Sequence, residues 1–256
     1  MITSTSNSQV KQAAALAKKA RERRQTGLFL VEGRKMYEEA PRDWLEKVYV
    51  TERYMEEYGQ PEAGVAWETV TDEVMKAMAD TRTPQGVLAL VRQPKWRLED
   101  VWKGENPHII MLETLQDPGN LGTILRAGEG AGITGLIMNR ETADIFNPKV
   151  IRSTMGSVYR VPFVYTDSLL EAAGEAKRRG IRLYAAHLKG ERSYDREDYR
   201  QGCGFLIGNE ARGLTDETAA LADCYVKIPM LGRVESLNAA VAASVLMFEA
   251  ARQRRG

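Results

Sequence analysis

Apolar runs and polar breaks alternate along the chain, and their lengths predict strands and helices in turn. In the first part, β-rich apolar runs lie at 29–31, 47–50, 66–70 and 86–91. Segments with helical character lie between them, near 34–40, 52–58 and 71–79. This alternation predicts a small α/β domain, which we bound at residues 1–95.

The alternation stops between Arg92 and Pro107, a stretch with two tryptophans and mixed charges. We expect a linker there, at residues 96–106. Further apolar runs then predict strands at 109–112, 135–138, 161–164, 182–186, 205–207 and 224–228. Continuous apolar strands with helices between nearly all of them predict a parallel sheet covered on both faces, in a second domain at 107–256. Such sheets bind ligands at the carboxyl ends of their strands.

Composition narrows the classes of protein and of site. The chain has 256 residues, 43% of them hydrophobic, and a net charge of +1, so any binding of nucleic acid must come from local patches. A polar N-terminus and the lack of a long apolar run predict a cytoplasmic protein with no membrane segment. Cys203 and Cys224 have no metal-ligand spacing, so we expect no metal site.

Residues 9–24 carry six cations against one acid on an alanine-rich background, which predicts a basic helix. Two interpretations stay open for a charge run of this kind. It is either a solvated helix face or an arm that contacts phosphates.

Three polar clusters each follow a predicted strand. The first, 117–128, has an Asp-Pro-Gly turn, Asn120 as a candidate helix cap, and Arg126. It lacks the glycine spacing and the later acid of a dinucleotide site, which disfavours nicotinamide binding. The second, 205–214, contains Gly208, where a ligand could approach the backbone, and Glu210, either a surface acid or a site residue.

The third cluster, 228–238, precedes an alanine-rich helix. We expect Ser236 to cap this helix and Ala240, Val241, Ser244, Val245 and Phe248 to form its buried face. Each cluster alone is ambiguous. Their order, with each at the exit of a strand, is more specific than any single loop.

In that order the clusters resemble the three motifs of the SpoU (TrmH-like) branch of the SPOUT RNA methyltransferases, at 120–126, 206–213 and 228–238. Residues 8–91, with Phe-Leu-Val-Glu-Gly-Arg and Pro-Gln-Gly-Val, resemble its ribosomal-protein-like RNA-binding domain. The resemblance implies an α/β SPOUT fold, in which the C-terminal segment is threaded into a deep trefoil knot. It also implies a homodimer that pairs through the knotted domain.

The resemblance further implies transfer of a methyl group from S-adenosyl-L-methionine to a ribose 2′-hydroxyl in structured RNA. The implied cofactor-binding residues are Gly208, Asn209, Ile228, Met230 and Leu237. The implied catalytic residues are Arg126, with Asn120, Glu210, Ser236 and Asn238 around it. A guanidinium donates hydrogen bonds and does not accept a proton. We therefore expect Arg126 to hold the adjacent phosphate and stabilise the 2′-oxyanion, or else to hold a phosphate whose oxygen accepts the proton.

The RNA partner is less constrained than the reaction. The two-domain layout favours rRNA over tRNA, by resemblance only. The predicted RNA contacts are Lys18, Lys19, Arg21, Arg23, Arg24 and Arg34. The alternatives are a tRNA ribose methyltransferase, a base methyltransferase on the same knotted fold, and a non-catalytic RNA-binding protein.

Overall fold

The computed structural model describes residues 1–188 and 190–255. These divide into two compact units. The first holds Met1–Lys95 and also Asp144–Tyr159, a segment that lies inside the range expected for the second domain. The second holds Trp96–Ala143 and the chain from Arg160 onward.

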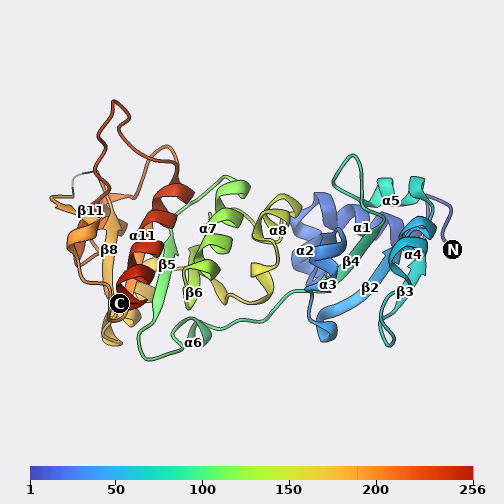
Figure 1. Ribbon diagram of the computed structural model, residues 1–256, viewed down its shortest axis with the longest axis horizontal. Coiled ribbons are helices and arrows are strands. Elements are labelled where there is room, and N and C mark those ends of the chain that lie inside the picture. Colours follow the sequence, from blue (N-terminus) through green and yellow to red (C-terminus); the bar gives the residue numbers. More distant parts are fainter. Residues whose placement is uncertain (189, 256) are drawn as a thin grey trace. The chain divides into compact units, whose positions relative to one another are not determined.

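The first unit is built on a sheet with the order β1-β4-β2-β3. Its strands are β1 (Leu28–Glu32), β2 (Leu45–Val50), β3 (Trp67–Thr69) and β4 (Val87–Arg92), close to the predicted runs. Strand β4 is antiparallel to both of its neighbours, and β2 is parallel to β3. Its helices are α1 (Ser8–Lys18), α2 (Ala20–Thr26), α3 (Arg34–Glu38), α4 (Glu52–Tyr58) and α5 (Asp72–Met78), with a 3-10 turn at Arg42–Trp44. Helices α1 and α5 contact each other, and apolar residues of both share a core with β2 and β4 (Figure 1).

The prediction of a single basic helix at 9–24 is wrong. Lys19 has an extended backbone, with φ −121° and ψ 112°, and separates α1 from α2. Val10, Ala13, Leu16 and Ala17 form the buried face of α1, so the break lets the chain turn while that apolar face stays covered. Gly27 ends α2 in the left-handed conformation, which glycine adopts without steric cost.

The segment Asp144–Tyr159 packs within the first unit through aromatic and charged contacts. It contains helix α8 (Pro148–Thr154), which Asn147 caps, and a 3-10 turn at Ser157–Tyr159. The ring of Phe146 lies 5.0 Å from that of Phe29, and the Tyr159 hydroxyl donates to the Met36 carbonyl at 2.9 Å. Aromatic burial of this kind makes the segment part of the core.

The second unit contains a seven-stranded sheet, within the described residues, in the order β7-β6-β5-β10-β8-β11-β9. The strands are β5 (His108–Leu112), β6 (Gly135–Asn139), β7 (Phe163–Thr166), β8 (Arg182–Ala186), β9 (Arg192–Ser193), β10 (Cys203–Ile207) and β11 (Cys224–Lys227). All six pairings are parallel, which confirms the predicted α/β fold class. The run predicted at 161–164 forms a strand two residues later, and β9 was not predicted.

Helices cover both faces of this sheet. Apolar residues of α6 (Leu98–Val101), α9 (Leu169–Arg178) and α10 (Asp216–Ala219) share one core cluster with β5, β8 and β10. Helices α7 (Pro118–Gly130) and α11 (Ala239–Arg255) pack side by side (Figure 1). Helix α6 lies inside residues 96–106, which we expected to be a linker. The second unit also contains a 3-10 turn at Tyr194–Arg196.

The start and the buried face of α11 both differ from prediction. Asn238, and not Ser236, caps the helix, because its Oδ1 accepts from the backbone N–H of Ala240 at 2.9 Å. The buried positions are Ala240, Ala243, Leu246, Met247 and Ala250. Val241 and Phe248, which we expected in the core, are 48% and 45% exposed. The buried face of α11 therefore combines small alanines with Leu246 and Met247, and Val241 and Phe248 lie partly outside it.

A search of the helices in the described ranges finds none that is both long and apolar enough to cross a membrane.

Candidate active site

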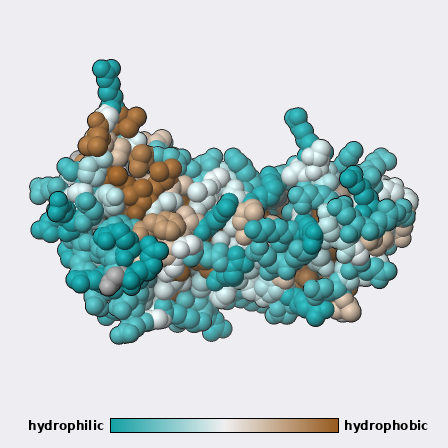
Figure 2. Space-filling view, in the orientation of Figure 1, coloured by the Kyte–Doolittle hydropathy of each residue, from teal (hydrophilic) through white to brown (hydrophobic). Residues whose placement is uncertain are grey.

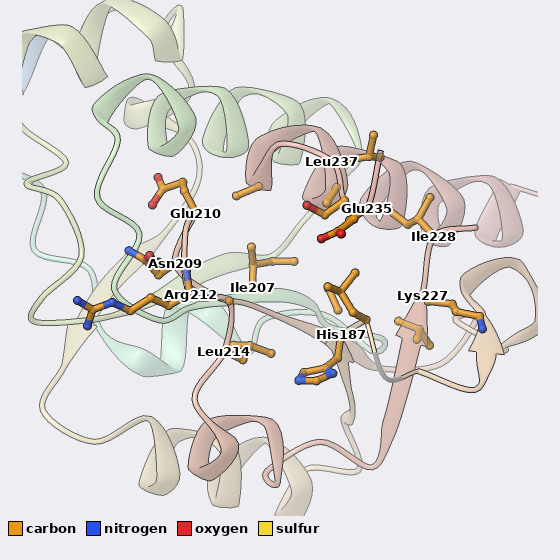
Figure 3. Close-up of a pocket in the computed structure, with 18 of the residues that line it drawn as sticks. His187, Ile207, Asn209, Glu210, Arg212, Leu214, Lys227, Ile228, Glu235 and Leu237 are labelled. Carbon is orange, nitrogen blue, oxygen red and sulfur yellow. Dashed lines mark hydrogen bonds between the residues drawn. The ribbon is translucent and has the colours of Figure 1, made fainter. Parts of the chain in front are cut away.

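A cavity of about 410 Å³ lies at the carboxyl ends of β8, β10 and β11. These strands are neighbours in the parallel sheet, so the segments that follow them meet at one edge. The wall is formed by 186–188, by 207–214, and by the end of β11 with the start of α11. Figure 3 shows Ile207 between the loop that carries Asn209 and Glu210 and the residues Glu235 and Leu237.

The 208–214 loop is closed on itself by backbone hydrogen bonds. Asn209 and Gly213 exchange N–H to carbonyl bonds of 3.0 and 2.9 Å. A Cβ on Gly208 would lie 2.1 Å from the carbonyl carbon of Gly213. The space left by the missing side chain is therefore filled by the chain itself, whereas the sequence suggested room for a ligand. Gly208 still lines the cavity.

Glu210 joins the first two motifs. Its carboxylate accepts from the backbone N–H of Asp117 at 2.8 Å and of Gln116 at 3.1 Å, and from Asn120 Nδ2 at 3.0 Å. Partial burial acts to raise the pKa of Glu210, but the hydrogen bonds from Asn120, Asp117 and Gln116 outweigh it and hold the pKa below its ordinary value. Glu210 is therefore a fixed anion at the cavity wall.

Asn238 brings the third motif into the same cluster. Its Nδ2 donates to Asn120 Oδ1 at 3.0 Å, so Asn238, Asn120 and Glu210 form one chain of hydrogen bonds, which we call the amide–carboxylate chain. Asn120 is free for this because Asp117 caps α7, accepting from the Asn120 N–H at 2.9 Å. The interpretation of Asn120 as the helix cap is wrong.

The structure places the other predicted site residues in two groups. The predicted cofactor residues Gly208, Asn209, Ile228, Met230 and Leu237 all line the cavity, as does Ser236. Arg126 does not line it. Arg126 is exposed on α7, and its guanidinium has no hydrogen bond or ion pair with any residue in the described ranges, so the structure does not bring it into the amide–carboxylate chain.

Several residues of the wall were missed from the sequence. They are Ala186, His187 and Leu188 after β8, Arg212 and Leu214 after β10, and Val226, Lys227 and Glu235 around the β11 loop. The position of His187 at the exit of a predicted strand was a usable signal, because carboxyl ends of parallel strands share one edge. No motif marked it.

One of the predicted RNA contacts must be withdrawn. Arg23 is 3% exposed, and its guanidinium pairs with Asp144 at 2.8 Å and donates to the Leu16 carbonyl at 2.6 Å. A saturated and buried guanidinium cannot reach a phosphate. The other members of the basic segment, Lys18, Lys19, Arg21 and Arg24, are exposed. Arg34 is exposed too, pairs with Glu38, and lies 4.2 Å from the ring centre of Tyr58.

The cavity suits a nucleoside-containing cofactor. Its size lies in the range of about 300–1,000 Å³ found for small-molecule sites. Ile207, Leu214 and Leu237 supply apolar walls, and the polar residues Asn209 and Ser236 line the same cavity. Among the described residues, no group of three or more histidine, cysteine or acidic side chains is placed to hold a metal ion.

Solved structures of the same fold align with nearly the whole chain, and so does a relative found by sequence. The methyltransferase AviRb of Streptomyces viridochromogenes, in complex with AdoMet, aligns with a TM-score of 0.86 and 28% identity over 98% of this chain and 99% of that one. An rRNA methyltransferase of Sinorhizobium meliloti aligns with a TM-score of 0.86 and 31% identity, over 98% and 96% of the two chains. The 23S rRNA (guanosine(2553)-2′-O)-methyltransferase RlmP of Bacillus subtilis is 30% identical over 96% of this chain and 97% of its own length.

Two sequence families match successive parts of the chain. Residues 7–89 match the MRM3-like substrate binding domain. Residues 107–248 match the SpoU rRNA Methylase family, which confirms the resemblance of the three motifs. The chain therefore belongs to the SpoU rRNA methylase family, with a SPOUT methyltransferase fold.

Proposed function

We propose that this protein transfers the methyl group of S-adenosyl-L-methionine to a ribose 2′-hydroxyl of ribosomal RNA. The amide–carboxylate chain carries the proposal, because it joins the three motifs beside one cavity. The names of two relatives support ribose as the acceptor. RlmP is named for a guanosine 2′-O position, and a Streptomyces viridochromogenes relative, 35% identical over 72% of this chain and 66% of its own, for a uridine 2′-O position. The sugar is common to both, and the base is not.

Gly208, Asn209, Ile228, Met230 and Leu237 would hold the cofactor, as the sequence motifs suggest. When bound, S-adenosyl-L-methionine supplies a methyl group activated by a positively charged sulfur. The apolar walls exclude water around it. The mutual backbone hydrogen bonds of Asn209 and Gly213 hold the 208–214 loop in one conformation, and a preorganised wall needs no rearrangement during reaction.

Glu210 is poorly placed to act as the base, because three donors already occupy its carboxylate. We propose that Glu210 and Asn120 fix the positions of the three motifs relative to one another. Arg126, exposed and without a protein partner in the described part of the chain, is available for the RNA. Its guanidinium would bind the phosphate next to the target ribose and stabilise the negative charge that develops on the 2′-oxygen as its proton passes to solvent water. Ser236 and Asn238 would form the polar edge near the ribose.

We propose that the first unit binds RNA through the exposed cations Lys18, Lys19, Arg21 and Arg24, with Arg34 as a further contact. We propose a cytoplasmic location as well, in keeping with ribosomal RNA as the proposed substrate. The trefoil knot implied by the motifs remains part of this proposal.

We also propose a homodimer that pairs through the second unit. Val241 and Phe248 on α11 are about half exposed, and Leu231 and Val234 on the preceding loop are 101% and 62% exposed. Figure 2 shows apolar side chains gathered where this loop and the start of α11 lie. An exposed patch of large apolar side chains favours a protein interface.

Arg126→Ala tests the assignment of function. We expect methyl transfer to ribosomal RNA to fall by at least about a hundredfold, the effect typical of losing one oxyanion donor. Calorimetric affinity for S-adenosyl-L-methionine should stay within about twofold, because Arg126 does not line the cavity. Normal turnover in this variant would contradict the role of Arg126. Digestion of the methylated RNA and identification of the nucleoside test the reaction itself: a base-methylated product, or methylation of tRNA only, would contradict it.

A further inference from the structure

Glu113 is a buried carboxylate that no motif includes and that does not line the cavity. It follows β5 directly, and its N–H donates to the Ile207 carbonyl at 2.9 Å, which extends the pairing of β5 with β10 by one residue. It is 8% exposed. A buried carboxylate needs hydrogen-bond donors around it, and its partners therefore show what it holds.

Within the described residues, the hydrogen bonds of the Glu113 carboxylate go to Thr215 and Thr218, at the start of α10. One oxygen accepts from the Thr215 N–H at 2.8 Å, and the other from the Thr215 hydroxyl at 2.8 Å and from the Thr218 hydroxyl. Thr215 is also the cap of α10, since its hydroxyl accepts from the Thr218 N–H at 3.1 Å. Glu113 thus fixes the point at which the cavity loop ends and α10 begins.

The next residue, Thr114, fixes the other end of the same loop. Its carbonyl accepts from Asn209 Nδ2 at 2.9 Å. Thr114 has φ 54°, a left-handed conformation that is uncommon for threonine, and Asn139 holds it through two hydrogen bonds of 2.8 Å. Strained residues persist where the surrounding structure determines them, and they occur often at functional sites.

We infer that Glu113 is a positioning residue for cofactor binding, which sets the shape of the 208–214 wall by holding Thr215 while Thr114 holds Asn209. The inference rests on the proposed function, because it takes the cavity to be the cofactor site. The Glu113 side chain neither lines the cavity nor bonds to the amide–carboxylate chain, and its partners are Thr215 and Thr218, so we expect it to act through the end of the loop.

Calorimetry with S-adenosyl-L-methionine on the whole protein tests this inference. We expect Glu113→Gln to raise the Kd at least tenfold, because the amide places an N–H donor against donors that are already there. Thr215→Val should weaken binding in the same direction, and Thr215→Ser, which keeps the hydroxyl, should restore it. If Glu113 acts through Thr215, the double variant Glu113→Gln/Thr215→Val should bind no more weakly than the weaker single variant.

Thr71→Ala is the matched control. Thr71 caps α5 in the first unit in the way that Thr215 caps α10. The Thr71→Ala variant should have a lower unfolding temperature and an unchanged Kd for the cofactor. Glu113→Gln should instead raise the KM for the cofactor and leave the affinity for RNA unchanged.

The possible outcomes separate the two proposals. Wild-type protein that fails to bind the cofactor would contradict the proposed function. Wild-type binding with an equal affinity in folded Glu113→Gln would overturn the role of Glu113. If Glu113→Gln does not fold, Thr218→Val, which removes one donor and keeps the cap, carries the test: a Kd raised by about threefold supports the inference, and an unchanged Kd overturns it.

Discussion

Asn238 has two separate tasks, and its two side-chain atoms divide them. Its Oδ1 caps α11, and its Nδ2 donates to Asn120 in the amide–carboxylate chain. Removing a cap costs about 1 kcal/mol of stability, and removing one partner from a network leaves the other unsatisfied. The atoms of one residue therefore link the fold of the last helix to the geometry of the site.

Asn238→Asp separates these tasks. The aspartate keeps the cap and loses the amide donor, so we expect an unfolding temperature close to that of the wild type. Methyl transfer should fall about tenfold or more, because a carboxylate would face the Asn120 Oδ1 acceptor. Asn238→Ala should lose both activity and about 1 kcal/mol of stability. Thermal unfolding and single-turnover kinetics measure the two effects, and full activity in Asn238→Asp would contradict the assigned role of the chain.

His108 predicts an acid-sensitive fold. It is fully buried, neither ring nitrogen has a hydrogen-bond partner among the described residues, and burial, followed by the nearby charge of Arg254, lowers its pKa from 6.5 to about 3. Between pH 3 and pH 6.5, His108 is protonated in the unfolded chain and neutral in the folded chain. The free energy of unfolding therefore has its full value above pH 6.5. Protonation of His108 in the unfolded chain lowers it as the pH drops toward 3, by at most about 1.4 kcal/mol per pH unit.

The variant His108→Leu should flatten this dependence. Urea unfolding at pH 7 and pH 5 measures the effect: the wild type should lose more stability than the variant between the two. His108 begins β5, at the end of the strand away from the cavity, so cofactor affinity should not change. Equal losses in both proteins would mean that another group controls the acid response.

At the scale of elements, the cations of residues 9–24 on either side of the break at Lys19 differ in exposure. Arg23 lies buried against Asp144, while Lys18, Lys19, Arg21 and Arg24 remain exposed. Changing these four to glutamate should weaken RNA binding and make its salt dependence shallower, by about 0.7–0.9 in log–log slope for each phosphate that the protein no longer neutralises. Binding titrations at several salt concentrations measure both quantities.

Two further variants complete that experiment. An equal change of charge at Lys177, Arg178, Arg252 and Arg255 in the second unit should have a much smaller effect. Arg23→Ala should instead destabilise the fold, by about 3–5 kcal/mol, because it leaves the partly buried Asp144 without its partner. If the four charge reversals leave the RNA affinity unchanged, Lys18, Lys19, Arg21 and Arg24 do not form the RNA-binding surface.

The sequence predicted most strands and the loops that carry the site, because period and strand exits are local signals. It did not predict which residue caps each helix. Ser236 and Asn238 are both good caps, as are Asp117 and Asn120, and only the tertiary partner of each side chain decides between them. The burial of Arg23 depends on Asp144, which is 121 residues away in the sequence. Contacts of that range leave no periodic trace.

At the scale of the whole molecule, α11 has two apolar faces, and the described residues bury one of them and leave the other about half exposed. The covered face consists of Ala240, Ala243, Leu246, Met247 and Ala250. The other carries Val241 and Phe248. Helices with apolar residues on all sides are usually buried on all sides, which favours a second copy of the chain as the cover.

Val241→Glu/Phe248→Glu should convert the proposed homodimer to a monomer. Both side chains are about half exposed in the single chain, so the loss of their buried halves should lower the unfolding free energy of the monomer by about 1–3 kcal/mol. A charge at the centre of an apolar interface costs several kcal/mol in association, and light scattering after size exclusion should therefore show half the mass. Leu170→Glu, at a residue 58% exposed on α9, is the matched control and should remain dimeric. A wild-type protein that is monomeric at micromolar concentration, or a double variant that still dimerises, would refute this use of the outer face of α11.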